Sequence, residues 1–261
     1  MKPDAIARAV LAGKPLDVPV IDAHGHIGSW HQFPMPRSTS AGLVAAMDGI
    51  GIDRLAISGI VGACGMNPVE GNNMVLDALT SHPDRFIGYA VVTPPNADAA
   101  LAEFKRCEAR GLRALKLHTW HGPLYTDAVY RPTLEYVNAR KYPVLLHTWG
   151  AGDMKMLAEL ATTYAGSMWI LGHTPSDLDG YISLAARFPN VALETCCSNA
   201  PFGLIEYLVA EAGADRVLFG SDAGFTSMAM MIGRIGLANI SVADKQKILG
   251  ENAARIFGLA A

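Results

Sequence analysis

The chain has 261 residues, enough to bury one large core. Hydrophobic residues make up 51% of the sequence and charged residues 17%, a balance that excludes an intrinsically disordered protein. The net charge is −3 and no run of basic residues occurs, so we expect no binding to nucleic acid or to an anionic membrane surface.

The cysteines and the apolar runs indicate the compartment. Cys64, Cys107, Cys196 and Cys197 contain no C-x-x-C pair and do not resemble a disulfide framework, which favours a reducing environment. The first 14 residues lack the long apolar core of a signal peptide, and no apolar run approaches the ~20 residues of a membrane span. We therefore expect a soluble cytoplasmic protein.

Short apolar runs alternate with longer amphipathic segments along nearly the whole chain. Eight runs are predicted strands: 18–23, 54–58, 86–92, 114–118, 144–147, 169–173, 191–194 and 217–220. The predicted helices are 41–50, 72–81, 98–110, 131–140, 154–164, 177–188, 202–212 and 227–235, with a closing helical pair at 242–250 and 251–257. Strands that are almost continuously apolar and alternate with helices indicate a parallel sheet covered by helices.

The length of the chain and the lack of a glycine-rich phosphate loop indicate the architecture. A length of 261 is close to the ~250 residues typical of a (β/α)8 TIM barrel. The competing open sheet usually carries a glycine-rich phosphate loop after its first strand, and no G-x-G-x-x-G follows that strand here. No linker or composition shift divides the chain. The prediction is a single (β/α)8 barrel in one domain, residues 1–261.

The segment Asp22-Ala23-His24-Gly25-His26 ends the first predicted strand. Side chains alternate along a strand, so Asp22, His24 and His26 are expected on one face. Two neutral imidazoles on one face can bind the same divalent metal. Further polar residues end later strands, as a barrel active site requires: His118, His147, His173 and Asp222.

A metal site is predicted at the mouth of this barrel. Its candidate ligands are His24 and His26 from the first strand, His147 from the fifth and Asp222 from the eighth. Three imidazoles and one carboxylate suit zinc, manganese or iron better than calcium or magnesium. We expect one divalent transition metal, zinc first with manganese and iron as alternatives, that activates water or polarises a substrate oxygen. Alternatively, the two histidines face solvent and Asp222 caps the next helix.

The motifs that carry this chemistry resemble those of the amidohydrolase superfamily, specifically its amidohydrolase-related branch of small hydrolases and metal-dependent nonoxidative decarboxylases. The matching segments span residues 22–257 and include Lys116-Leu117-His118, Gly172-His173, Gly220-Ser221-Asp222 and the tail 250–257. The resemblance implies that His24, His26, His147 and Asp222 bind a catalytic metal. It also implies that His173 is an acid/base group or a further ligand. The chain departs from the pattern at Ala223-Gly224, where relatives often carry an aromatic residue and a proline.

Lys116 has two alternative roles. A lysine within a strand is costly unless it is paired or lies at the mouth, where it can hold a substrate carboxylate as a point charge. The resemblance to binuclear relatives implies instead a carboxylated Lys116 that bridges two metals, with His173 on the second. His118 shares the face of Lys116 by alternation and is a candidate pocket residue.

Aromatic residues cluster in the loops expected around the mouth, and Trp30, Trp120 and Trp149 are candidate substrate-binding residues. Aromatic walls with few polar anchors suit a small, flat organic substrate. The same residues could instead pack loops onto the barrel rim. Glu194 and Cys196, near the end of the seventh strand, could face the same pocket.

The leading functional prediction is hydrolysis of an ester, lactone or amide by metal-activated water, with Asp222 or His173 moving the proton. The alternative is a lyase that decarboxylates an aromatic or unsaturated acid without oxidation. A third, less favoured hypothesis is a barrel that binds a ligand without turnover. The partner expected is a small-molecule substrate. Barrels of this kind can form homo-oligomers, but no feature of the sequence identifies an interface.

Overall fold

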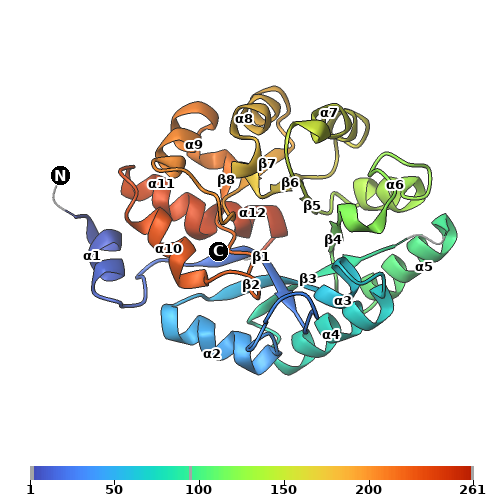
Figure 1. Cartoon of the computed structure of the whole chain (residues 1–261), viewed down its shortest axis with the longest axis horizontal. Helices are drawn as coiled ribbons and strands as arrows, with labels where there is room; N and C mark the ends of the chain where they lie inside the picture. Colours follow the sequence, from blue (N-terminus) through green and yellow to red (C-terminus); the bar gives the residue numbers. More distant parts are fainter. Residues whose placement is uncertain (1–2, 94–95, 260–261) are drawn as a thin grey trace.

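Eight short parallel strands follow one another around a single sheet in chain order (Figure 1). The computed structural model describes residues 3–93 and 96–259. The strands are β1 (Ile21–Ile27), β2 (Arg54–Gly59), β3 (Phe86–Val91), β4 (Ala114–Leu117), β5 (Val144–His147), β6 (Trp169–Gly172), β7 (Val191–Glu194) and β8 (Val217–Leu218). Backbone hydrogen bonds from Ala23 N to Phe219 O (2.9 Å) and from His26 N to Ala223 O (2.8 Å) close the ring. The predicted (β/α)8 barrel is confirmed.

Helices surround the strands (Figure 1). They are α1 (Ala5–Leu11), α2 (Ser40–Ile50), α3 (Ile60–Ala63), α4 (Pro68–Ser81), α5 (Ala97–Glu108), α6 (Arg131–Ala139), α7 (Met154–Thr163), α8 (Leu178–Arg187), α9 (Leu204–Ala212), α10 (Met228–Gly236), α11 (Val242–Gln246) and α12 (Asn252–Phe257). Within residues 3–93 and 96–259, none of them combines the length and the apolar character that a membrane crossing needs.

The helices depart most from the prediction at two places, and α1 and α3 were not predicted. Helix α4 begins at Pro68 rather than at residue 72, because the Asn67 side chain caps it by accepting from Glu70 N (3.3 Å) and Pro68 fits the first turn. The predicted closing pair is one continuous helical segment, in which a π-helical turn, Lys247–Glu251, joins α11 to α12.

Small and branched side chains, together with one tyrosine, fill the barrel interior near the amino ends of the strands. They are Ile21, Ala23, Ala56, Tyr89, Ala114, Leu145, Ile170, Ala192 and Leu218. Helix α12 covers this end, where the Phe257 ring packs edge-on against Tyr89 at 5.8 Å between centroids. Because this end of the interior is filled, we expect a polar site inside the barrel at the opposite end.

A one-residue bulge in β1 changes which way its side chains point. Asp22 pairs with Leu55 and Gly25 with Ile57, so three steps along β1 match two along β2. Leu55 and Ile57 belong to the outer core, between sheet and helices. Asp22 therefore faces outward, where its carboxylate accepts from Ser221 N at 3.0 Å. The prediction that Asp22 shares the face of His24 and His26 is wrong.

Close packing of β2 on α4 requires glycine at residue 59. A Cβ atom there would overlap the backbone of Gly71, so the Gly59→Ala variant must separate the strand from the helix. We expect a loss of about 1–3 kcal/mol in the free energy of unfolding, measured by urea denaturation.

The matched control is Gly49→Ala in α2, where no atom lies within 4 Å of the added Cβ. This substitution should raise stability by about 0.5–1 kcal/mol, because alanine favours a helix more than glycine does. Equal stabilities for Gly59→Ala and the wild type would contradict the packing argument.

Candidate metal centre

Three side chains converge where β1 meets the segment that follows β8. Asp222 Oδ1 lies 3.1 Å from His26 Nε2 and 3.6 Å from His24 Nε2. These donor atoms all lie within 4.8 Å of one another. Ligand atoms around a tetrahedral ion with bonds of ~2.1 Å are separated by about 3.4 Å, so the spacing suits a divalent transition metal.

The carboxylate of Asp222 supports the same conclusion. Its Oδ1 atom is buried and accepts no hydrogen bond from the residues that the structure describes, an arrangement that is costly unless another group is bound there. Burial alone would raise the pKa of Asp222, but contacts with His26 and His24 outweigh it and hold the pKa below its usual range. The group is therefore an ionised potential ligand at neutral pH.

His24 and His26 each have a hydrogen-bond partner on Nδ1, the ring nitrogen opposite Nε2, and this partner orients the ring. His26 Nδ1 lies 3.0 Å from Ser58 Oγ on β2, and His24 Nδ1 lies 3.2 Å from Glu194 Oε2 on β7. Burial lowers the pKa of both imidazoles, which keeps them neutral and able to bind a metal. A proton held on Nδ1 leaves the Nε2 lone pair directed to the side of Asp222.

Lys116 lies beside this group at the end of β4. Its Nζ atom is fully buried, 3.2 Å from His24 Nε2. Burial lowers the pKa of Lys116 from its usual value. The amine is thus close enough to act on a molecule held at the three converging side chains.

His147 lies next to these residues but outside the groups of donor atoms that come within 4.8 Å of one another. Its ring stacks on His118 at 4.0 Å between centroids and lies 4.6 Å from the ring of His173. Burial lowers the pKa of His147 to about 2, so the ring is a neutral donor at the mouth. The Trp149 ring continues the stack, nearly parallel to His147 at 6.2 Å.

The predicted tryptophans lie around the same mouth. The side chains of Trp120 and Trp149 are 50% and 55% exposed. Trp30 is half-buried, with its ring 6.4 Å from that of Trp120, and its Nε1 atom has no hydrogen-bond partner among the described residues. The exposed aromatic surface of Trp120 and Trp149 is therefore available to a ligand that enters here.

Two residues ending strands stand in strained backbone conformations. His173, after β6, has φ 64°, and Asp222, after β8, has φ 57°. Non-glycine residues adopt this left-handed region at a cost of about 1–3 kcal/mol, and they concentrate at functional sites. Both strained residues were candidates from sequence.

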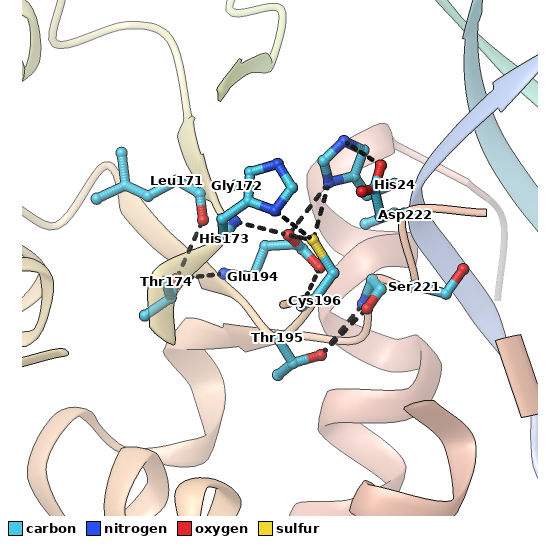
Figure 2. A network of polar contacts seen from close by, with 12 residues as sticks. His24, Leu171, Gly172, His173, Thr174, Glu194, Thr195, Cys196, Ser221 and Asp222 are labelled. Atoms are coloured by element: carbon cyan, nitrogen blue, oxygen red, sulfur yellow. Dashed lines mark hydrogen bonds and ion pairs between the residues drawn. The ribbon is translucent and has the colours of Figure 1, made fainter. Parts of the chain in front are cut away.

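A second polar cluster lies beside the first and is centred on Glu194 and Cys196, the two residues that the sequence indicated could face the same pocket (Figure 2). Glu194 Oε2 accepts from the Cys196 thiol (2.8 Å) and from His173 N (3.2 Å). Cys196 Sγ in turn lies 3.2 Å from His173 Nδ1. Strand alternation with Ala192, an interior residue, is consistent with this inward orientation of Glu194.

Comparison with known proteins identifies relatives of this chain in sequence and in fold. Among curated proteins, the gamma-resorcylate decarboxylase of Rhizobium sp. (strain MTP-10005) is 24% identical over 247 residues, which cover 73% of this chain and 75% of that protein. Among solved structures, the 2,6-dihydroxybenzoate decarboxylase from Rhizobium has a TM-score of 0.75 at 20% identity, covering 92% of this chain and 99% of that one.

A dihydroxybenzoic acid decarboxylase from Polaromonas sp. JS666, solved with bound manganese and the inhibitor 2-nitroresorcinol, has a TM-score of 0.71 at 20% identity. The alignment covers 92% of this chain and 97% of that one. These structural likenesses show a shared fold. The family model described as Amidohydrolase matches residues 21–259, almost the whole chain, and the protein therefore belongs to the amidohydrolase family.

Proposed function

We propose that this protein is a metal-dependent decarboxylase that removes the carboxyl group of a small aromatic acid without oxidation. The observation that carries the choice is the match to curated gamma-resorcylate decarboxylase along 73% of the chain. It favours the lyase alternative over hydrolysis, which the metal centre by itself would serve equally well.

The proposed metal ligands are the three converging side chains, His24, His26 and Asp222, together with the neighbouring His147. A divalent cation bound there would attract substrate oxygens and offset their negative charge. The manganese in the related decarboxylase from Polaromonas makes manganese as good a candidate as zinc.

The remaining mouth residues would bind and orient the substrate. Lys116 is the buried cation next to His24 and suits a carboxylate or a phenolate oxygen. His118 Nδ1 accepts from Trp120 N at 3.1 Å, so Nε2 is the atom that would hydrogen-bond a ring substituent. The rings of Trp30, Trp120 and Trp149 offer faces for stacking on a flat molecule.

The reaction needs one proton at the ring carbon that bears the carboxylate. When that carbon is protonated, the bond to the carboxylate breaks, carbon dioxide leaves, and the bonding electron pair restores the aromatic ring. Asp222 and His173, which face the same mouth, are the groups proposed to hold or move this proton.

We also propose a partner and a cellular compartment for the enzyme. The partner is a small-molecule substrate. All four cysteines carry free thiols, which is consistent with the reducing cytoplasm that we propose as its compartment.

The metal requirement is testable by direct measurement. We expect about one equivalent of a divalent transition metal per chain, and loss of turnover after treatment with a chelator. The variants Asp222→Ala and His24→Ala should lose the bound metal, measured by elemental analysis of dialysed protein. The control Glu103→Gln alters a carboxylate that accepts from Asn72 and Arg106, away from the mouth, and should retain it. Full turnover in metal-free protein would contradict the proposal.

Isotopic labelling separates the two reaction classes. With an aromatic acid such as 2,6-dihydroxybenzoate in heavy water, decarboxylation should release carbon dioxide and leave one solvent deuterium on the ring carbon that lost the carboxylate. When the same acid reacts in ¹⁸O-labelled water, the organic product should contain no solvent oxygen. Mass spectrometry of the products gives both results. Turnover of esters, lactones or amides with ¹⁸O in the organic product, and none of aromatic acids, would identify a hydrolase instead.

A further inference from the structure

We propose that Glu194 and Cys196 form a buried positioning pair, which directs His24 toward the metal and His173 toward the substrate. The inference rests on the proposed function in taking His24 as a metal ligand and His173 as a proton-transferring group. Neither residue touches substrate in this account, and both act through the histidines that they contact (Figure 2).

Glu194 is fully buried, and every group that faces its carboxylate is a hydrogen-bond donor. Oε2 receives the Cys196 thiol (2.8 Å), the His173 backbone N–H (3.2 Å) and the His24 Nδ1–H (3.2 Å). Oε1 receives the Cys196 backbone N–H (2.6 Å). An amide in place of the carboxylate would place its NH2 group against one of these donors. Gln therefore cannot replace Glu here without the loss of at least one hydrogen bond.

The surrounding structure is built around this carboxylate. The backbone N–H of Glu194 donates to Thr174 Oγ1 at 3.0 Å, and the same hydroxyl donates to Leu171 O at 3.1 Å. A Cβ atom at Gly220 would overlap the Glu194 side chain, so the glycine leaves the space that the carboxylate occupies. The Glu194 backbone is therefore held by Thr174, and Gly220 leaves the space for its carboxylate.

Its contact with His24 decides which ring nitrogen is available. A proton held on Nδ1 by the carboxylate leaves the lone pair on Nε2, the atom that lies with His26 and Asp222. Carboxylate partners of metal-binding histidines fix the tautomer and raise ligand basicity, and their loss costs about 10–100-fold in metal affinity.

Cys196 extends the same arrangement to His173. Its thiol donates to Glu194, so the sulfur lone pairs can accept from His173 Nδ1 at 3.2 Å. A proton on Nδ1 again leaves the Nε2 atom of His173 free for proton transfer. A base held by a second group, which is itself held by a third, is the usual arrangement of proton-transferring side chains.

The donor atoms of His24, His173 and Cys196 also lie within 4.8 Å of one another, as those of a second metal site would. Such a site would take His24 Nδ1, the nitrogen whose proton the Glu194 carboxylate receives. In the positioning role, Glu194 and Cys196 hydrogen-bond the two histidines, and each chain binds one metal. A second metal equivalent is accordingly a distinct outcome of the test.

The first test measures manganese affinity of Glu194→Gln without substrate, by competition with a chelator. We expect affinity to fall about 10–100-fold relative to the wild type. Gly220→Ala displaces the carboxylate without removing its charge, and it should also lower the manganese affinity. Glu103→Gln is the matched control, because Glu103 also accepts from a buried cysteine, Cys107, at 3.4 Å. It should bind manganese like the wild type.

The second test separates the role of Cys196. Cys196→Ala should keep the metal and lower kcat about tenfold with little change in KM, whereas Cys196→Ser, which keeps a donor and an acceptor, should recover most of kcat. Cys107→Ala, the control for removing a buried thiol, should leave both constants unchanged.

The outcomes distinguish this inference from the proposed function. Failure of the wild type to bind manganese or any other divalent metal would overturn both. Wild-type metal affinity in Glu194→Gln or Gly220→Ala, or unchanged kcat in Cys196→Ala, would overturn the positioning role alone. Two metal equivalents in the wild type and one in Cys196→Ala would replace that role with a second metal site. If Glu194→Gln does not fold, Gly220→Ala and the Cys196 variants decide.

Discussion

Backbone hydrogen bonds between β1 and the segment after β8 determine whether this protein has a functional site at all. The bonds from Ala23 to Phe219 and from His26 to Ala223 join residues nearly 200 positions apart in sequence. They bring His24 and His26 against Asp222, which an open sheet would leave at opposite edges. Closure also gives the barrel an enclosed interior. Helix α12 covers one end of this interior, and polar groups occupy the other end.

The polar groups at the open end depend on one another in a second way. Each buried histidine of the first cluster has one ring nitrogen occupied by a protein partner, Ser58 for His26 and Glu194 for His24. The opposite nitrogens face Asp222, whose Oδ1 atom has no partner among the described residues. Such a network is stable only when its members are satisfied. A cation at the junction would satisfy His24, His26 and Asp222 together.

Much of this arrangement can be predicted from sequence, because the strands are apolar and regularly spaced. Strand β5, predicted at 144–147, has the same bounds in the structure, and the polar residues after the strands meet at one end as expected. The orientation of Asp22 could not be predicted, since the bulge in β1 is set by pairing with β2. Helix α3 was also missed, because one turn of apolar residues has no detectable period.

The reaction class was harder to predict than the fold, for a chemical reason. Three imidazoles and a carboxylate at a barrel mouth serve hydrolysis and decarboxylation alike, so the ligand types do not discriminate. The contacts that would discriminate lie in the mouth, where we propose that Lys116, His118 and the tryptophans bind the substrate. Their arrangement depends on the loops that follow the strands, and comparison with gamma-resorcylate decarboxylase favours one reaction.

We propose that the metal binds where β1 meets the segment after β8. Anomalous diffraction from crystals soaked in manganese, recorded at the manganese edge, locates the metal directly. We expect one strong peak within bonding distance of His24 Nε2, His26 Nε2 and Asp222 Oδ1. A peak on His173 and Cys196 instead, or none at the mouth of the barrel, would contradict it.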